Sequence, residues 1–246
     1  MNFYSVIIGT ELLNGRRCDA HFSFLNSELL KRGWEQKANF VIKDEPPFME
    51  TVFNLIKNDP DAVLFSFGGI GATPDDYTRQ TAAKVFTKGD MEINEGAKKA
   101  ILDKFGKDAY PHRINMANLP TDAGLLKNVV TNVPGFSLED RYFFVPGFPS
   151  MAQSMIIEAL DKYYPKNEAK YRLTLTAHCS ENDLIDTMKK IPTDVDMSSL
   201  PQINGDKRAV VISVASYDKK RTEENFETFT SFLNDKNIKY DLEDKV

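Results

Sequence analysis

Short runs of apolar residues alternate along the chain with segments whose apolar positions recur at helical spacing. The apolar runs lie at 3–8, 38–42, 62–67 and 142–145, and helical spacing is found at 22–31, 48–56, 74–86 and 151–160. Runs this short and almost uniformly apolar predict strands that are buried on both faces. Strands that alternate with helices favour a mostly parallel sheet covered by helices on both sides. We therefore expect the α/β class, with three layers in the order α/β/α.

The pattern changes after the polar segment 163–168, which contains Pro165 and is a candidate linker. The elements expected beyond it are a strand at 171–177, a helix at 182–191, strands at 195–203 and 209–215, a helix at 222–233 and a short strand at 238–242. This βαββαβ order is that of the ferredoxin-like fold. For a chain of 246 residues, we expect a first domain over 1–165 and a small ferredoxin-like α+β domain over 170–246.

Composition and charge exclude several classes of function. Hydrophobic residues make up 41% and charged residues 27%, as in ordinary globular proteins. Lys and Arg total 31 against 36 Asp and Glu, so no basic field attracts nucleic acid. No apolar stretch approaches the roughly 20 residues of a membrane helix, and no basic leader follows Met1, so we expect a cytoplasmic protein. Cys18 and Cys179 lack metal-binding spacing and are expected to be reduced thiols.

A glycine-rich turn is the first candidate for chemistry, because it joins the strand at 62–67 to a helix expected at 74–86. Its sequence is Gly68-Gly69-Ile70-Gly71-Ala72-Thr73-Pro74-Asp75-Asp76. Consecutive N–H groups in such a turn, next to a helix amino terminus, form a site for phosphate, and glycines let the ligand approach. The pattern matches neither the P-loop nor the dinucleotide fingerprint. The glycines are therefore expected to hold pyrophosphate oxygens by another arrangement.

The same turn also has an explanation without a ligand. Thr73 suits the N-cap of the expected helix, Pro74 its first position and Asp76 the acidic position of a capping box. Two consecutive acids exceed what capping requires. Asp75 and Asp76 are thus also candidates for binding a divalent metal or positioning water.

Two further loops follow strands. The polar loop at 9–21 lies after the first strand, and ligands in open α/β sheets bind beyond such strand ends. Glu11 and Asp19 are expected to face the acids of the glycine-rich turn, although Asp19 alone is more simply an N-cap for the helix near Phe22. The loop at 146–150 lacks the nucleophile elbow and is expected to be a stiff turn that can wall a pocket.

Histidines contribute less to the predicted site. His21, His112 and His178 have no metal-ligand spacing, and each is expected at the surface or in an ordinary hydrogen bond. Arg79, one turn into the expected helix, is a candidate for neutralising phosphate charge, with a surface ion pair as the alternative.

The three loops together resemble the molybdopterin-binding domain of MoaB/Mog-type proteins, and more closely the amino-terminal region of the competence/damage-inducible protein A (CinA) family. The matching segments, in the family's order, are 8–15 with Asp19, 68–76, 133–136 and 146–150. The resemblance covers about residues 1–160, and the tail is similar to the CinA middle domain. The amidohydrolase domain that often closes CinA proteins is expected to be missing.

The resemblance implies three competing activities: a divalent-cation-dependent ADP-ribose pyrophosphatase, molybdopterin binding with adenylyl transfer, or binding without catalysis. It implies catalytic roles for Asp19 and Asp76, a Mg²⁺ or Co²⁺ ion at Asp75 and Asp76, and molybdopterin as another ligand. The residues expected to contact the phosphorylated ligand are Gly9, Thr10, Glu11, Gly68, Gly69, Gly71, Thr73, Gly135, Pro146 and Gly147. Similar proteins form dimers or trimers, so self-association is expected, with neither membrane nor nucleic acid as partner.

Four positions depart from the family's pattern. His21 stands where Asn is common, and Ala72 stands where Pro is common. Met116 replaces the Gln of a Gln-Ala pair, and Thr131 replaces a glycine. Met cannot make the hydrogen bonds of an amide, and Thr adds a Cβ near the backbone.

The leading hypothesis is metal-dependent hydrolysis of a nucleoside diphosphate compound such as ADP-ribose. Acidic side chains beside a phosphate-binding turn would hold the ion that activates the attacking water. The departures at Met116 and Thr131 motivate the alternative, a non-catalytic or adenylyl-transferring protein that binds molybdopterin or a nucleotide.

Overall fold

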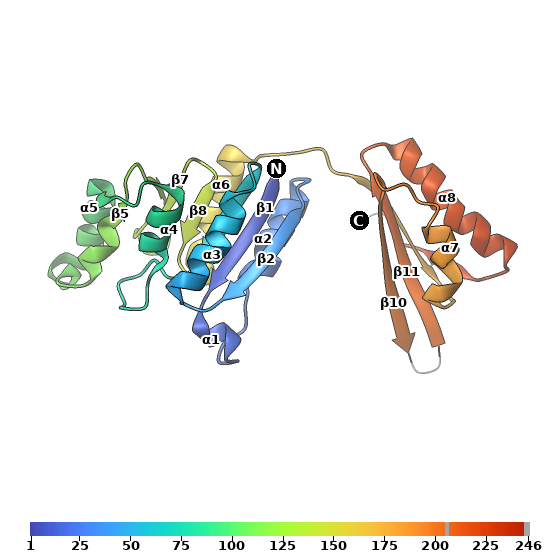
Figure 1. Ribbon diagram of the computed structural model, residues 1–246, viewed down its shortest axis with the longest axis horizontal. Coiled ribbons are helices and arrows are strands. Elements are labelled where there is room, and N and C mark those ends of the chain that lie inside the picture. The colour runs from blue at the N-terminus through green and yellow to red at the C-terminus, as the bar shows by residue number, and fades with distance from the viewer. Residues whose placement is uncertain (205–206, 244–246) are drawn as a thin grey trace. The chain divides into compact units, whose positions relative to one another are not determined.

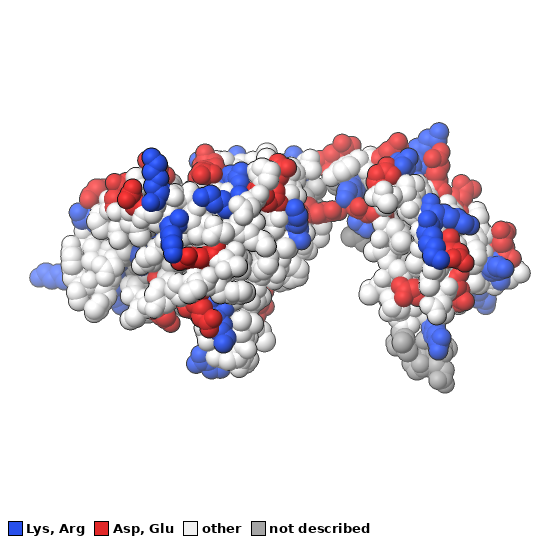
Figure 2. Space-filling view, in the orientation of Figure 1, with Lys and Arg blue, Asp and Glu red and all other residues white. Residues whose placement is uncertain are grey.

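A computed structural model describes residues 1–204 and 207–243 of the chain. The chain divides into two compact units, Met1–Asn167 and Glu168–Val246 (Figure 1). Among the described residues, no helix combines the length and the apolar character needed to cross a bilayer. On the face visible in Figure 2, basic and acidic side chains are interspersed on both units.

The first unit is built on a six-stranded sheet with the order β2-β1-β3-β8-β7-β6. The strands are β1 (Asn2–Ile8), β2 (Gln36–Ile42), β3 (Ala62–Phe67), β6 (Gly124–Leu126), β7 (Gly135–Leu138) and β8 (Tyr142–Val145). β2, β1, β3 and β8 are parallel, and at one edge β7 pairs antiparallel with β8 and β6 pairs antiparallel with β7. β1 and β3 carry almost uninterrupted buried residues, as strands covered on both faces must.

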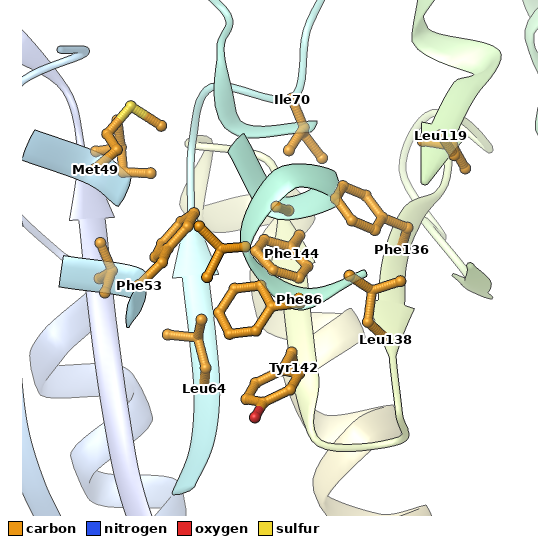
Figure 3. Close-up of a cluster of buried hydrophobic side chains, with 14 of the residues drawn as sticks. Met49, Phe53, Leu64, Ile70, Phe86, Leu119, Phe136, Leu138, Tyr142 and Phe144 are labelled. Carbon is orange, nitrogen blue, oxygen red and sulfur yellow. The ribbon is translucent and has the colours of Figure 1, made fainter. Parts of the chain in front are cut away.

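Helices cover both faces of this sheet, so the predicted α/β/α class is confirmed. The principal helices are α2 (His21–Lys31), α3 (Pro46–Lys57), α4 (Thr78–Phe86) and α6 (Pro149–Tyr163), and the short α1 (Thr10–Leu13) follows β1. α3 and α4 pack in one apolar cluster, in which the Phe86 ring lies 5.5 Å from that of Phe53 and 4.2 Å from that of Tyr142 (Figure 3). α2 and α6 pack in a second cluster on the opposite face, against Phe3 and Ile7 of β1.

The segment between α4 and β7 contains elements that the hydrophobic pattern does not reveal. These are β4 (Met91–Ile93), α5 (Glu95–Phe105), the 3₁₀ turns η1 (Gly106–Ala109) and η2 (Arg113–Ala117), and β5 (Asn118–Pro120). α5 buries only Ala97 and Ile101, so its apolar face is too narrow to stand out in the sequence. Its start is instead set by Asn94, whose side chain accepts a hydrogen bond from the Ala97 N–H at 3.0 Å.

The second unit has the predicted βαββαβ order. Its elements are β9 (Tyr171–Ala177), η3 (Glu181–Leu184), α7 (Ile185–Met188), β10 (Asp196–Asn204), β11 (Lys207–Ser216), α8 (Lys219–Asp235) and β12 (Tyr240–Leu242). The strands form an antiparallel sheet with the order β10-β11-β9-β12. Phe226, Phe229 and Leu233 of α8 pack on this sheet. The helix expected at 182–191 is instead a 3₁₀ turn followed by one short α-helical turn.

A carboxylate in the loop between α3 and β3 makes the stability of the first unit sensitive to acid. Asp59 Oδ2 accepts hydrogen bonds from Asn2 Nδ2 at 2.8 Å, Tyr4 OH at 2.7 Å and Lys37 Nζ at 3.0 Å. The Tyr4 hydroxyl and the Lys37 ammonium hold the pKa of Asp59 well below its usual range. Because the pKa of Asp59 is lower in the folded chain than in the unfolded chain, its ionised carboxylate stabilises the fold at pH values above the ordinary Asp pKa of about 4. This stabilisation is lost as the pH falls below that pKa.

We therefore expect Asp59→Asn to lower the free energy of unfolding at pH 7. The decrease in this free energy between pH 7 and pH 3 should be smaller in the variant than in the wild type. Urea unfolding at both pH values measures this. Asp61→Asn, in the same loop, is the control and should behave like the wild type. Equal acid sensitivity in the wild type and Asp59→Asn would contradict the prediction.

Candidate functional site

The three loops singled out in the sequence come together at the carboxyl ends of β1, β3 and β8. These strands are parallel and adjacent, so their following loops share one edge of the sheet. The loops surround a polar cavity of about 230 Å³. The predicted residues that line it are Gly9, Glu11, Asp19, Gly68, Gly69, Thr73, Asp75, Asp76 and Gly147.

The remaining predicted residues lie elsewhere. Gly71 and Pro146 line a second cavity of about 380 Å³ beside the first. In the part of the chain that the structure describes, Thr10 and Gly135 line neither cavity. Thr10 donates to Asp44 Oδ2 from its N–H at 2.8 Å and its hydroxyl at 2.9 Å. A Cβ at Gly135 would lie 2.5 Å from the Phe144 carbonyl oxygen, so this glycine is needed for the packing of β7 against β8.

Gly68 and Gly69 have a packing role in addition to the ligand contact predicted for them. Their φ angles of +95° and +67° lie in the left-handed region. A Cβ would lie 2.5 Å from the Ile8 carbonyl oxygen at Gly68 and 2.2 Å from Thr78 Oγ1 at Gly69. The Cβ side of both glycines is therefore filled by the protein itself, so packing alone requires glycine at these positions, while both residues also line the polar cavity.

Backbone N–H groups of this turn are only partly available to a ligand. The Gly68 N–H donates to the Val145 carbonyl at 2.9 Å and is occupied. Among the described residues, the N–H of Gly69, which lines the cavity, has no acceptor. Of these two N–H groups, that of Gly69 is the one that can donate to a ligand in the cavity.

Helix α4 begins later than the sequence predicts. It starts at Thr78, whose N–H donates to the Gly69 carbonyl at 3.0 Å. Thr73 and Asp76 form a separate turn, in which Asp76 Oδ2 accepts from the Thr73 N–H at 2.7 Å and the Thr73 hydroxyl at 2.5 Å. Thr73 is therefore not the N-cap of α4, because the turn closes on itself before the helix begins.

Acidic side chains dominate the charge of the polar cavity. The carboxylates that line it are Glu11, Asp19, Asp44, Asp75 and Asp76, and Arg17 is the guanidinium among them. Asp44 was not among the predicted site residues, although it lies just beyond the end of β2, as the other candidates lie beyond the ends of their strands.

Asp19 lies immediately before Ala20, the N-cap residue of α2. Its carboxylate accepts from the N–H of His21 at 2.8 Å and of Phe22 at 3.1 Å, so it satisfies the first turn of α2, and it also lines the polar cavity.

Within residues 1–204 and 207–243, no three His, Cys, Asp or Glu side chains are grouped so as to hold a metal ion by themselves. The carboxylates nevertheless fit Mg²⁺ chemistry, because this ion is commonly held by one or two carboxylates with waters and substrate phosphates. A metal at this cavity would therefore depend on oxygen atoms of the ligand.

His21 and Arg79 are both buried, which agrees with the hydrogen-bonded alternative expected for His21 and contradicts the surface ion pair considered for Arg79. The His21 side chain is 5% exposed, its ring lies 4.5 Å from that of Phe67, and Nε2 lies 3.3 Å from the Gly147 carbonyl oxygen. Burial lowers the pKa of His21, which favours a neutral ring. Arg79 is also 5% exposed and donates to the carbonyls of Gly71, at 2.8 Å, and Asn115. It joins the glycine-rich turn to η2 and, among the residues that the structure describes, forms no surface ion pair.

The second cavity is mostly apolar and adjoins the first. Its apolar lining residues are Ile70, Ala72, Phe105, Met116, Val133, Pro134, Pro146, Phe148 and Met151. Met116 and Thr131, two departures from the family's pattern, both belong to its wall. The residues that line both cavities are Gly69, Thr73, Asp76, Gly147 and Phe148.

Known proteins resemble the first unit most. The family described as "Probable molybdopterin binding domain" matches residues 5–166. A CinA-like protein of Fusobacterium nucleatum is 29% identical over 197 residues, which are 78% of this chain and 48% of that protein. A CinA-like protein of Geobacter sulfurreducens is 30% identical over 166 residues, which are 65% of this chain and 40% of that protein.

A solved structure is similar in the same region. The crystal structure of the protein CinA from Thermoplasma acidophilum, described as having unknown function, has a TM-score of 0.59 and 28% identity. The match covers 66% of this chain and 98% of that chain. By contrast, the chain spans about half or less of the length of the two CinA-like relatives.

Proposed function

This chain belongs to the family described as "Probable molybdopterin binding domain", and on that basis we propose that its two adjoining cavities bind one phosphorylated ligand with a flat ring. The observation that carries the proposal is the wall that the two cavities share. An acidic polar cavity suits an ion-bound phosphate group, and an apolar cavity beside it suits an aromatic ring. Nucleotides and pterin phosphates both have this form.

We further propose that the polar cavity hydrolyses the phosphoanhydride bond of a nucleoside diphosphate compound such as ADP-ribose. The Gly69 N–H would donate to a phosphate oxygen, and Asp75 and Asp76 would hold a divalent ion, Mg²⁺ or Co²⁺, together with the diphosphate. When bound, such an ion polarises the phosphoryl group and lowers the pKa of water. Asp19 would orient the attacking water at the cavity wall.

The products follow from the bond that breaks. The water oxygen forms a new bond to one phosphorus atom, and the bridging oxygen leaves with the other. AMP and ribose 5-phosphate are then released from ADP-ribose, with the proton of the attacking water passing to solvent. No redox partner is needed for this reaction.

Binding without turnover is the second candidate. It is supported by the structural hydrogen bonds of the acids, because Asp19 satisfies the first turn of α2, Asp44 holds Thr10 and Asp76 holds the Thr73 turn. Acids that serve only in this way would leave a ligand intact.

The purified chain distinguishes the two candidates in one experiment. It is incubated with ADP-ribose and a series of Mg²⁺ or Co²⁺ concentrations, and AMP is quantified while calorimetry measures binding. Metal-dependent AMP release, abolished by EDTA, is expected for the hydrolase. Binding without AMP would favour the non-catalytic function, and the absence of binding to ADP-ribose, AMP and molybdopterin would reject both.

A further inference from the structure

We propose that the apolar cavity recognises the ligand ring by shape and stacking, without hydrogen bonds to the ring edge, so that the protein accepts different bases carried on a diphosphate. This inference rests on the proposed binding function and adds the class of ligand to it. It follows from the pairing of the polar groups in the cavity wall and from one exposed aromatic ring.

The amide of Asn128 is already fully used. Asn128 is 1% exposed. Its Nδ2 donates to Thr131 Oγ1 at 2.7 Å and to the Val133 carbonyl at 3.0 Å. Its Oδ1 accepts from the N–H groups of Val130 at 3.0 Å and Thr131 at 3.1 Å. The one amide side chain that lines this cavity among the described residues therefore has no group left for a base edge.

Several other polar groups of the wall already have partners inside the protein. The Thr73 hydroxyl donates to Asp76, which lines both cavities. The Gly71 carbonyl accepts from Arg79 at 2.8 Å. The Gly147 carbonyl accepts from Arg17 Nη2 at 3.2 Å and lies 3.3 Å from His21 Nε2. The Asn128 amide and the Thr73 hydroxyl therefore have no donor left for a base edge.

An exposed aromatic ring lies where the two cavities meet. Phe148 lines both cavities and is 59% exposed, and the Arg17 guanidinium lies 5.6 Å from its ring centroid. Stacking on such a ring tolerates any base, because every base has a π-face. Met116 and Met151 complete the wall, and their flexible side chains can adapt to rings of different size.

Adenine and guanine give the sharpest test, because they have the same size and opposite donor and acceptor patterns on their pairing edges. The protein is titrated with ADP, GDP and inorganic pyrophosphate in Mg²⁺ by calorimetry. We expect the Kd values of ADP and GDP to differ by less than about fivefold, which is the least that a hydrogen-bonded edge contributes to discrimination. A difference of fivefold or more would overturn the inference.

Pyrophosphate distinguishes recognition of the ring from binding of the phosphates. It should bind more weakly than ADP by on the order of tenfold, because it lacks the stacked ring. Equal affinity would reject ring recognition while leaving phosphate binding intact. Failure of all three compounds and of ADP-ribose to bind would instead reject the proposed function.

Two variants extend the test to named side chains. Phe148→Ala should weaken ADP and GDP alike, by roughly 5- to 100-fold, whereas Phe148→Trp should retain affinity for both. Met116→Gln places a free amide of similar size on the wall and should create a preference between ADP and GDP. Unchanged affinity in Phe148→Ala, with melting temperature preserved, would show that the ring does not stack there.

Discussion

Gly69→Ala is expected to destabilise the first unit by about 3–5 kcal/mol, instead of acting on ligand binding alone. The new methyl group would lie 2.2 Å from Thr78 Oγ1, and the φ of +67° disfavours any L-residue. Thr78 has little room to move, because it is fully buried and its hydroxyl donates to the Gly68 carbonyl at 2.9 Å. Urea unfolding and the melting temperature measure the loss.

Gly89 provides a matched control for this substitution. It has a φ of +90°, yet a Cβ there would meet no atom within 4 Å. Gly89→Ala should therefore lower stability by only about 1–2 kcal/mol, which is the cost of a left-handed φ for a residue with a Cβ. If Gly69→Ala were as stable as Gly89→Ala but failed to bind ADP-ribose, the glycine would serve the ligand and our interpretation of its packing role would be wrong.

Asp75→Asn is expected to reduce metal-dependent AMP release by at least about 100-fold, if the proposed hydrolysis operates. The ion contributes several kcal/mol of transition-state stabilisation, and a neutral amide is a poor ligand for Mg²⁺. Asp75 is a cleaner target than Asp76, because it is exposed, whereas Asp76 holds the Thr73 turn with hydrogen bonds of 2.7 and 2.5 Å. Steady-state rates across a Mg²⁺ series measure the effect.

Asp103→Asn makes the same chemical change outside the site. Asp103 is an exposed residue of α5 and lines neither of the two cavities described above. This variant should keep the wild-type rate, and both variants should keep the wild-type melting temperature. Equal rates in Asp75→Asn and Asp103→Asn would show that Asp75 has no role in the reaction.

The sequence alone predicted the α/β class and the meeting of the three candidate loops at one edge of the sheet. β1 and β3 are recognisable because a strand buried on both faces needs apolar residues throughout, and this property is local. The parallel order implied by the alternating helices brings the loops after β1, β3 and β8 to one edge. The resemblance to CinA and molybdopterin-binding proteins, inferred from these loops, is confirmed by the family match over residues 5–166.

The sequence was less informative about the presence and the bounds of helices whose local signals are weak or ambiguous. α5 was missed because it buries only Ala97 and Ile101. Helix α4 was expected to begin near Pro74 because Thr73 and Asp76 have capping-box spacing, but in the folded chain these two residues close a turn of their own. The same residue types at the same spacing can satisfy either arrangement.

Only the tertiary structure decided what individual residues at the site do. Gly69 is needed because of the hydroxyl of Thr78, His21 is buried between the first and third loops, and Arg79 joins the glycine-rich turn to η2. Asp44 enters the cavity because β2 lies beside β1. In each case the role depends on partners brought together by packing, whereas the local hydrophobic pattern records only which face of an element is buried.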